Sequence, residues 1–443
     1  MPIKVVIIGG GSSYTPELIE GMLDRYESFP ITNIVLVDIK EGEEKLETVG
    51  KLAKRMIKKA GKQIHLTWTL DRREALKDAD FVTTQIRVGG LKAREKDERI
   101  PLSHGFIGQE TNGAGGIMKA FRTIPILMDI ANDIHDICPN AWLINFTNPA
   151  GIIIEALIKY SHHKRVIGVC NIPLNMRHSV AEILAVKPSD IMIEFIGMNH
   201  FVFGSKIYVK GMERTEEVLA KLQEKLDYSP ANIVSLGWTK ELLQSLKVLP
   251  NPYHDYYFHT REVLNQDVKA FREYGTRAEI VQQLEKDLFM LYSDSKLNAK
   301  PKELEERGGA YYSDVACSLM DSLYNNKRDV QTVNTINNGA ISDLPEDTVI
   351  EANCIITKDG PEPILVGNLP ISIKGIILQM KNTEELVIQA ALSGKYEDAY
   401  LSFLMNPLIG DEKMSKTLLN ELLIAHKEHL PQFKEAIRQI EII

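Results

Sequence analysis

The chain has 443 residues, of which 44% are hydrophobic and 25% are charged, an ordinary composition for a globular protein. A chain of this length is expected to form two or three domains. Its formal net charge of -8 at pH 7 argues against a general affinity for nucleic acid or anionic membranes. Its apolar runs are too short to span a bilayer, and the first residues lack the parts of a signal peptide. We therefore expect a cytoplasmic protein without membrane or nucleic-acid partners.

The cysteines are few and irregularly spaced for so long a chain. They favour neither a disulfide framework nor a structural zinc module, so each has to be judged singly. The four are Cys138, Cys170, Cys317 and Cys354.

The first predicted elements are a strand, a tight glycine turn and a helix. Residues 3–8 are apolar except for Lys4 and mostly β-branched, and Thr15 and Pro16 are typical of a helix N-terminus. In a dinucleotide-binding protein, glycines at such a turn let the backbone approach the pyrophosphate, and the helix N-terminus favours its negative charge. The candidate cofactor-binding residues of this loop are Gly9, Gly10, Gly11, Ser12 and Ser13.

A second predicted strand, residues 34–37, ends at Asp38. An acid at this position can accept hydrogen bonds from the ribose hydroxyls and repel a 2′-phosphate, which favours NAD over NADP. Tyr14 replaces the third glycine of the usual fingerprint, so a plain turn in an unrelated α/β protein stays open as an alternative.

Later apolar runs continue the alternation of strands and helices. Residues 81–85, 141–146 and 166–169 are predicted as buried parallel strands. The fold class is therefore α/β, with a Rossmann-like doubly wound NAD-binding domain at 1–197 and an α+β domain for substrate, metal and oligomerisation at 198–443. In the second half we predict a strand at 202–209 and amphipathic helical segments at 279–292 and 415–440.

Polar residues cluster where the predicted parallel strands end. Ligands of open α/β sheets bind outside the carboxyl ends of the strands, so these residues could share one pocket. As an alternative, each can be a turn former, a solvated charge or a small buried hydrophobe. The residues are Arg94, Glu110, Asn148, Cys170 and Asn171.

Cys170 and His200 are candidate metal ligands. A thiolate and an imidazole are both good donors to divalent metals. The alternative for His200, which precedes an aromatic residue, is a satisfied core histidine.

The ordered motifs together resemble the NAD- and manganese-dependent glycoside hydrolases of family 4, over essentially the whole chain. The motifs are residues 9–17, 108–111, 145–149, 170–173, 197–200 and 251–253. Within that family, Asn171 after the metal-binding Cys170 resembles the 6-phospho-β-glucosidase branch, because the α-glucoside branch has Asp there. The resemblance implies hydrolysis of β-linked 6-phosphorylated disaccharides such as cellobiose 6′-phosphate, giving glucose 6-phosphate and a second sugar.

The mechanism that the resemblance implies starts with oxidation of the sugar at C3 by NAD+. The ketone acidifies the proton on C2, a base removes that proton, and the aglycone leaves C1 by elimination. Water then adds, and the hydride returns. Cys170 and His200 would hold Mn2+ or another divalent metal against the oxygens on C2 and C3.

The resemblance also implies roles for single residues. Tyr253 matches the base for the C2 proton, and Glu110 matches the residue that raises its basicity; the nearby Tyr256 and Tyr257 leave the register of the base open. The substrate-binding residues would be Arg94, Asn148, Asn171 and Arg277, with the arginines on the phosphate. Arg277 could instead be a surface charge on a helix. The acid that protonates the leaving group is unassigned, because Asn171 cannot donate a proton as an Asp would.

Two other classes of protein remain open on sequence alone. An NAD-dependent hydroxy-acid or sugar-phosphate dehydrogenase would share the cofactor loop, and a non-catalytic sensor would bind a sugar phosphate without turnover. The resemblance suggests a homodimer or homotetramer.

Overall fold

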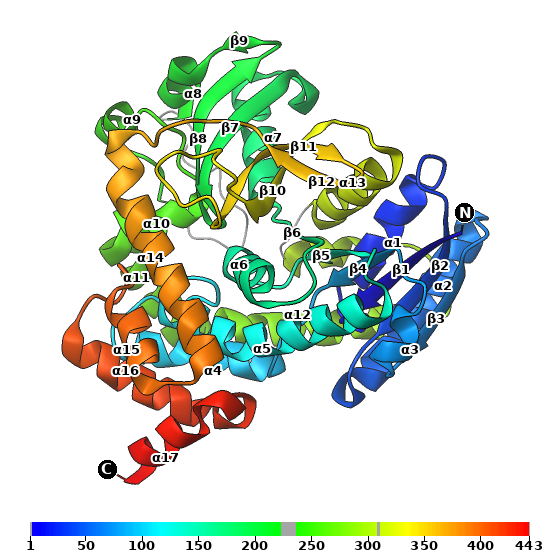
Figure 1. Ribbon diagram of the computed structural model, residues 1–443, viewed down its shortest axis with the longest axis horizontal. Helices are drawn as coiled ribbons and strands as arrows, with labels where there is room; N and C mark the ends of the chain where they lie inside the picture. Colours follow the sequence, from blue (N-terminus) through cyan, green and yellow to red (C-terminus); the bar gives the residue numbers. More distant parts are fainter. Residues whose placement is uncertain (1, 223–235, 308–310, 443) are drawn as a thin grey trace.

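The computed structural model describes residues 2–222, 236–307 and 311–442, and a nine-stranded sheet lies at its centre (Figure 1). In spatial order the strands are β12 (Gly360–Pro363), β11 (Val349–Thr357), β10 (Val330–Ile336), β6 (Val166–Gly168), β5 (Trp142–Asn145), β4 (Phe81–Thr84), β1 (Ile3–Ile8), β2 (Ile31–Val37) and β3 (His65–Thr69). Strands β1 to β6 are parallel, whereas β10 pairs antiparallel with both β6 and β11.

Strand β1 shows why this sheet forms. Its side chains alternate between two apolar clusters, one on each face of the sheet: Val6 and Ile8 belong to the first, and Val5 and Ile7 to the second. A strand that is buried on both faces has to be apolar where it is buried; residues 5–8 are apolar and buried, and Lys4 near the start of the strand is only partly buried. The predicted Rossmann-like α/β fold is confirmed for this sheet.

Helices pack on both faces of the sheet, and further helices pack outside these two layers. The first half of the chain contributes α1 (Thr15–Asp24), α2 (Glu43–Ala60), α3 (Arg72–Leu76), α4 (Gly90–Ser103), α5 (Gly113–Ile137), α6 (Ala150–Tyr160) and α7 (Ile172–Leu184). The second half contributes α8 (Thr215–Leu222), α9 (Lys240–Leu246), α10 (Asp255–Phe258), α11 (Thr260–Tyr274), α12 (Arg277–Ser293), α13 (Tyr312–Asn325), α14 (Ile371–Ser393), α15 (Tyr396–Leu404), α16 (Glu412–Ala425) and α17 (Lys434–Ile442).

A second, three-stranded antiparallel sheet packs beside β11 and carries His200. It consists of β7 (Ile191–Met198), β8 (Phe201–Val209) and β9 (Met212–Glu213). The predicted strand at 202–209 corresponds to β8. Strands β10 to β12 lie beyond residue 198 yet extend the first sheet, and the predicted domain boundary at 197 stays a prediction.

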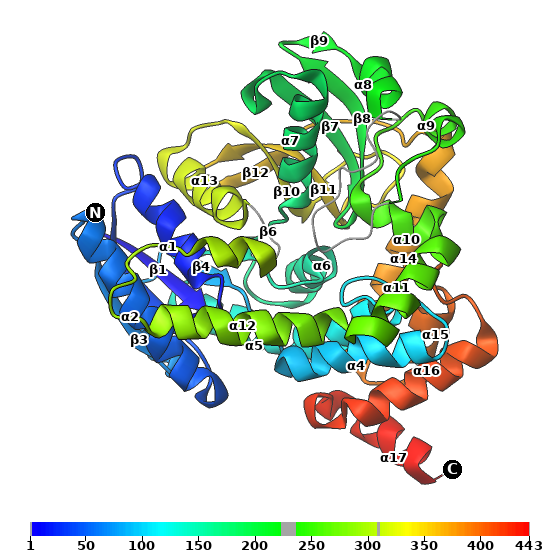
Figure 2. The same cartoon turned by 180° about the vertical axis from the view of Figure 1, so that it is seen from behind.

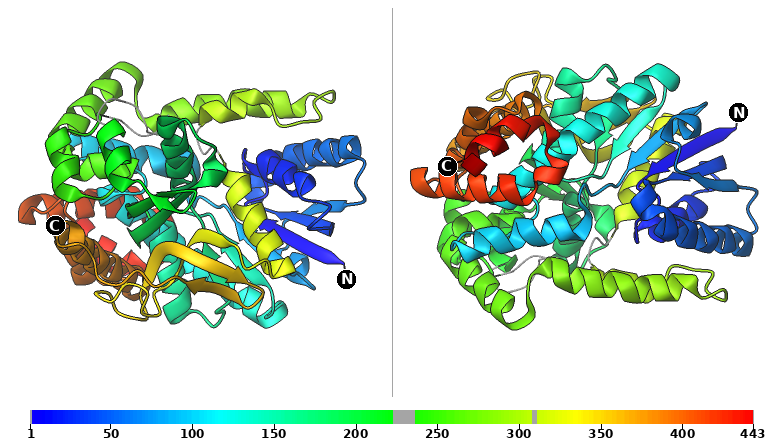
Figure 3. Two further views of the ribbon diagram at one scale, coloured as in Figure 1. Left: turned by 90° about the horizontal axis from the view of Figure 1, so that it is seen from above. Right: turned by 90° about the horizontal axis from the view of Figure 1, so that it is seen from below.

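Helix α12 is a long helix that contacts both α4 and α2, and it runs along one side of the molecule (Figures 2 and 3). A capping box at Thr276 and Glu279 fixes its start, which places Arg277 in its first turn. The predicted helical stretch at 415–440 is instead two helices, α16 and α17. Short 3-10 turns separate them, and Pro431, which has no backbone N–H, begins one of these turns. No helix in the described parts of the chain has the length and apolar character needed to cross a membrane.

Candidate active site

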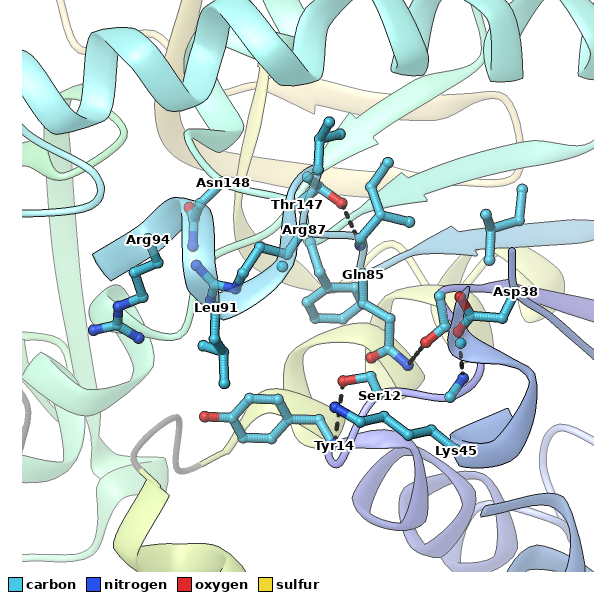
Figure 4. Close-up of a pocket in the computed structure, with 18 of the residues that line it drawn as sticks. Ser12, Tyr14, Asp38, Lys45, Gln85, Arg87, Leu91, Arg94, Thr147 and Asn148 are labelled. Carbon is cyan, nitrogen blue, oxygen red and sulfur yellow. Dashed lines mark hydrogen bonds between the residues drawn. The ribbon is translucent and has the colours of Figure 1, made fainter. Parts of the chain in front are cut away.

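One cavity of about 2060 Å3 lies at the carboxyl ends of β1, β4, β5 and β6. We call the end lined by Gly9, Gly11, Ser12 and Asp38 the nucleotide end. We call the end lined by Cys170, His200 and Tyr253 the chemistry end. Figure 4 shows Ser12 and Asp38 on one side of this pocket and Arg94 and Asn148 on the other. Residues from distant parts of the sequence thus line the same space.

The nucleotide end depends on backbone conformation. Gly9 and Gly10 both donate their N–H groups to Val37 O, at 2.9 and 2.8 Å, and Gly11 N–H donates to Asp38 Oδ2 at 2.8 Å. Gly9 has a positive φ of 85°, and a Cβ on Gly11 would lie 2.8 Å from Asp38 Oδ2. A turn without side chains at the start of α1 fits the close approach of a dinucleotide pyrophosphate.

The predicted cofactor residues divide into two groups. Gly9, Gly11, Ser12 and Asp38 line the cavity. Gly10 and Ser13 are buried behind the loop, where the carbonyl of Ser13 accepts a hydrogen bond from Tyr292. These two residues shape the turn but do not line the cavity.

Cys170 and His200 are brought together from two different sheets. Cys170 follows β6, and His200 lies at the turn of the β7–β8 hairpin with a positive φ of 60°. Both are less than a tenth exposed. Burial, followed by the charge of Lys119, lowers the pKa of His200 to about 3, so its imidazole is neutral and keeps a lone pair for a metal.

The thiol of Cys170 needs a cation to ionise, since burial and then Glu351 raise its pKa far above the usual range. A coordinated divalent metal supplies such a cation. Within residues 2–222, 236–307 and 311–442, no group of three His, Cys, Asp or Glu side chains could hold a metal. A thiolate and a neutral imidazole are both donors that divalent metals accept, so this pair fits a metal that takes its remaining ligands from elsewhere.

Tyr253 is held in a short 3-10 turn, Pro252–His254, directly against His200. Its N–H donates to Asn251 Oδ1 at 2.7 Å, and its ring stacks on the imidazole with 4.2 Å between centroids. Burial, followed by Cys170, raises the pKa of Tyr253 well above its usual value, and a hydrogen bond with Thr111 opposes the rise. As a base it would therefore need a nearby cation.

The two neighbouring tyrosines have other partners. The hydroxyl of Tyr256 accepts a hydrogen bond from Gln109 at 3.1 Å, and that of Tyr257 donates to Asn112 at 3.2 Å. Of the three candidates, Tyr253 is the one that lines the cavity and stacks on His200. This geometry favours it as the base.

Glu110 is surrounded by cations. Its carboxylate accepts hydrogen bonds from Arg87 and from Lys119 Nζ at 2.8 Å, and it forms an ion pair with Arg94 Nη1 at 3.0 Å. Although burial opposes ionisation, these three charges hold the pKa of Glu110 well below its usual range. Its negative charge in turn contributes to the raised pKa of Tyr253, which makes the phenolate more basic.

The predicted substrate-binding residues all line the same cavity. Arg94 lies on α4, Arg277 begins α12, Asn148 follows β5, and Asn171 is at the N-cap of α7. Arg277 Nη2 donates to Glu306 O at 3.3 Å, while its buried Nε has no hydrogen-bond partner among the described residues. An unsatisfied guanidinium in a cavity fits an anionic group such as phosphate.

Two buried charges of this site are absent from the sequence-based prediction. Lys119 is 4% exposed, lines the cavity beside Glu110 and has its pKa lowered to about 8 by burial. Glu98 accepts from Arg94 Nε at 2.6 Å and from the N–H of Ala278 at 2.8 Å, so it links α4 to the start of α12. In the sequence, Lys119 is one of several charges in a mostly apolar helical stretch, and Arg122 follows three residues later.

Comparison with known proteins gives the same picture as this geometry. Residues 4–186 match the family described as Family 4 glycosyl hydrolase, and residues 195–409 match its C-terminal domain. The chain belongs to family 4 of the glycosyl hydrolases. The resemblance seen in the sequence motifs is thereby confirmed.

Individual relatives cover nearly the whole chain. A probable 6-phospho-beta-glucosidase of Bacillus subtilis is 52% identical over 97% of this chain and 98% of its own length. The 6-phospho-beta-glucosidase of Escherichia coli is 46% identical over 99% of this chain and 98% of its own length. The structure of the 6-phospho-beta glucosidase from Thermotoga maritima with manganese, NAD+ and glucose-6-phosphate has a TM-score of 0.88 and 34% identity. That alignment covers 96% of this chain and 99% of that one.

Proposed function

We propose that this protein is a 6-phospho-β-glucosidase that hydrolyses β-linked 6-phosphorylated disaccharides, such as cellobiose 6′-phosphate, to glucose 6-phosphate and a second sugar. The main support is that the glycine loop, the Cys170 and His200 pair, and Tyr253 line one cavity together with the arginines. Family membership and relatives named for this activity support the same function. Asn171 supports the β branch, since the α branch has Asp at this position.

The residues of the chain divide the reaction between them. Gly9, Gly11, Ser12 and Asp38 would hold NAD+, while Cys170 and His200 would hold a divalent metal such as Mn2+. When bound, NAD+ would accept a hydride from C3, and the metal would stabilise negative charge on the sugar oxygens and on Tyr253. Arg94 and Arg277 would bind the 6-phosphate and Asn148 the sugar, which fixes C2 beside Tyr253.

Tyr253 would remove the proton on C2 once C3 is a ketone, and the aglycone would then leave C1 by elimination. Glu110 would keep Tyr253 basic through its charge, and it would hold Lys119, Arg87 and Arg94 in place at the same time. Tyr253 would return a proton to C2 as water adds to C1, and the sugar would be restored once the hydride held by the cofactor goes back to C3.

The cellular setting follows from the same chemistry. Cys138, Cys170, Cys317 and Cys354 are all free thiols in the structure, and Cys170 has to remain reduced to act as a ligand. We place the enzyme in the reducing cytoplasm. Independently of the cysteines, the family resemblance suggests a homodimer or homotetramer. Light scattering of the purified protein measures the oligomeric state.

Release of p-nitrophenol from p-nitrophenyl β-glucoside 6-phosphate tests the proposed function. We expect hydrolysis only with NAD+, Mn2+ and a reductant together, and no hydrolysis of the glucoside without its phosphate. Full activity after exhaustive removal of NAD+ and metal would contradict the proposal. Stoichiometric accumulation of NADH would indicate a dehydrogenase instead.

A further inference from the structure

Glu351 is a buried carboxylate that no described cation neutralises. It lies in β11 and is 0% exposed. Its Oε1 accepts hydrogen bonds from Asn199 Nδ2 at 3.2 Å and Asn334 Nδ2 at 3.0 Å, whereas Oε2 has no partner among the described residues. Burial raises the pKa of Glu351 to about 7. A buried carboxylate without a cation is costly for a fold to keep.

Another buried glutamate of the same region has the cations that Glu351 lacks. Glu155 is also 0% exposed, but Lys381 and Lys159 bind its carboxylate at 2.7 and 2.9 Å. No salt bridge within the described ranges reaches Glu351. A cation from outside the chain would fill this role, and the charge of Glu351 already acts on the Cys170 thiol, whose pKa it helps to raise.

Asn199 connects Glu351 to Cys170. Its Oδ1 accepts a hydrogen bond from the N–H of Gly151 at 3.4 Å, and a Cβ on Gly151 would lie 2.9 Å from the Cβ of Asn199. Since a backbone N–H can only donate, the amide oxygen faces Gly151 and the amide nitrogen faces the opposite side. There the amide nitrogen bonds to Glu351, and the side chain also forms a hydrogen bond with Cys170.

We propose that Glu351 is a positioning residue for the metal site: through Asn199 it directs an N–H donor onto the Cys170 sulfur, and its charge complements a divalent cation held by Cys170 and His200. The proposal rests on the metal site of the proposed function. Loss of a group that bonds directly to a metal ligand typically lowers metal affinity by about 10- to 100-fold, and Glu351 acts on such a group, Asn199. Asn334, opposite Glu351 on β10, holds the carboxylate from the other side.

The variant Glu351→Gln tests this role, because it keeps the shape and the Oε1 acceptor but removes the charge. The dissociation constant for Mn2+ is measured from the electron paramagnetic resonance signal of free Mn2+, with NAD+ present. We expect it to rise about tenfold or more. The dissociation constant for NAD+ should stay within about twofold, because a carboxylate behind Cys170 does not reach the nucleotide end. The melting temperature of the metal-free protein should not fall.

Two comparisons separate positioning from a general structural role. Glu362→Gln removes a charge from the exposed side of the same sheet and should leave Mn2+ affinity unchanged. In the Co2+-loaded protein, Glu351→Gln should change the thiolate-to-cobalt charge-transfer absorption, which reports directly on the Cys170 sulfur. Glu351→Asp keeps the charge at a shorter reach and should give an intermediate Mn2+ affinity. It also serves as the test if the glutamine variant does not fold.

Unchanged Mn2+ affinity in Glu351→Gln, with metal-dependent hydrolysis by the wild type, would overturn the role of Glu351 alone. Equal weakening of NAD+ and Mn2+ binding, together with a lower melting temperature, would also overturn it in favour of a structural role. Wild-type protein that hydrolyses substrate without binding Mn2+ would overturn both this role and the proposed metal site.

Discussion

At the nucleotide end of the cavity, the contacts come from one stretch of chain, residues 9–38, in which backbone N–H groups bond to Val37 and Asp38. At the chemistry end, Cys170 follows a strand of the large sheet, His200 lies on a hairpin of the small sheet, and Tyr253 lies in a 3-10 turn. One end is local and formed mainly by backbone, and the other is assembled from distant side chains.

This difference predicts how each end responds to substitution. Backbone donors survive a change of a neighbouring side chain, so side-chain variants such as those of Asp38 should have modest effects, whereas the glycines of the turn have no room for a Cβ. At the chemistry end each side chain is buried and carries one chemical role, so its loss leaves nothing equivalent nearby. The following variants test this contrast, in order of decreasing effect.

Cys170→Ser should abolish activity, with kcat/KM falling by at least about 10,000-fold, because a metal supplies several kcal/mol of charge stabilisation. Mn2+ binding should be lost in parallel, as measured by titration calorimetry. Cys138→Ser changes a buried cysteine at the end of α5 and should retain both. Substantial turnover in Cys170→Ser without bound metal would contradict the predicted difference between the two ends of the cavity.

Tyr253→Phe should lower kcat by about 100- to 1000-fold and leave KM nearly unchanged, since the hydroxyl acts in proton transfer more than in binding. Steady-state kinetics with the phosphorylated chromogenic substrate measure both constants. Tyr257→Phe removes the hydroxyl that bonds to Asn112 and should reduce kcat by less than about tenfold, the range of one net hydrogen bond. A larger effect at Tyr257 would place the base one turn further along the chain.

Arg277→Met should raise KM for the 6-phosphorylated substrate by about 10- to 100-fold, because a hydrogen bond to a charged group contributes about 1.5 to 3 kcal/mol. Its kcat should change less than its KM. Arg272→Met, on the exposed side of α11, is the matched control and should behave as wild type. Equal KM values for both variants would show that Arg277 does not bind the phosphate.

Asp38→Ser should have the smallest effect, raising KM for NAD+ about fivefold, in line with about 1 kcal/mol for a net hydrogen bond. It should also narrow the preference for NAD+ over NADP+, because a charge that repels the 2′-phosphate is gone. The ratio of kcat/KM for the two cofactors is the measurement. Glu47→Ser, an exposed change on α2, should leave the ratio unaltered.

The same contrast explains what could be predicted from the sequence. Strand β1, the glycine turn and Asp38 follow from short-range patterns, and strands β4, β5 and β6 differ from prediction only at their ends. The pairing of β6 with β10 joins Gly168 to Asn334, and no local pattern carries such a contact. The antiparallel extension of the sheet could therefore not be predicted from the sequence.

At the chemistry end, family motifs pointed to Cys170, His200 and Tyr253, and the structure places all three together at the cavity. Lys119 and Glu98 were not predicted as site residues because their roles depend on how α4, α5 and α12 pack. A buried charge on a helix has the same local sequence signal as a solvated one, and only tertiary contacts distinguish the two.

Hydrolysis in deuterated water measures most directly whether this cavity removes the proton on C2 during glycoside cleavage. With NAD+ and Mn2+ present, the glucose 6-phosphate product should carry deuterium at C2, detected by NMR or mass spectrometry, because Tyr253 exchanges its proton with solvent before returning one. Product with only hydrogen at C2 would show that no C2 proton is exchanged with solvent during cleavage and would contradict the account.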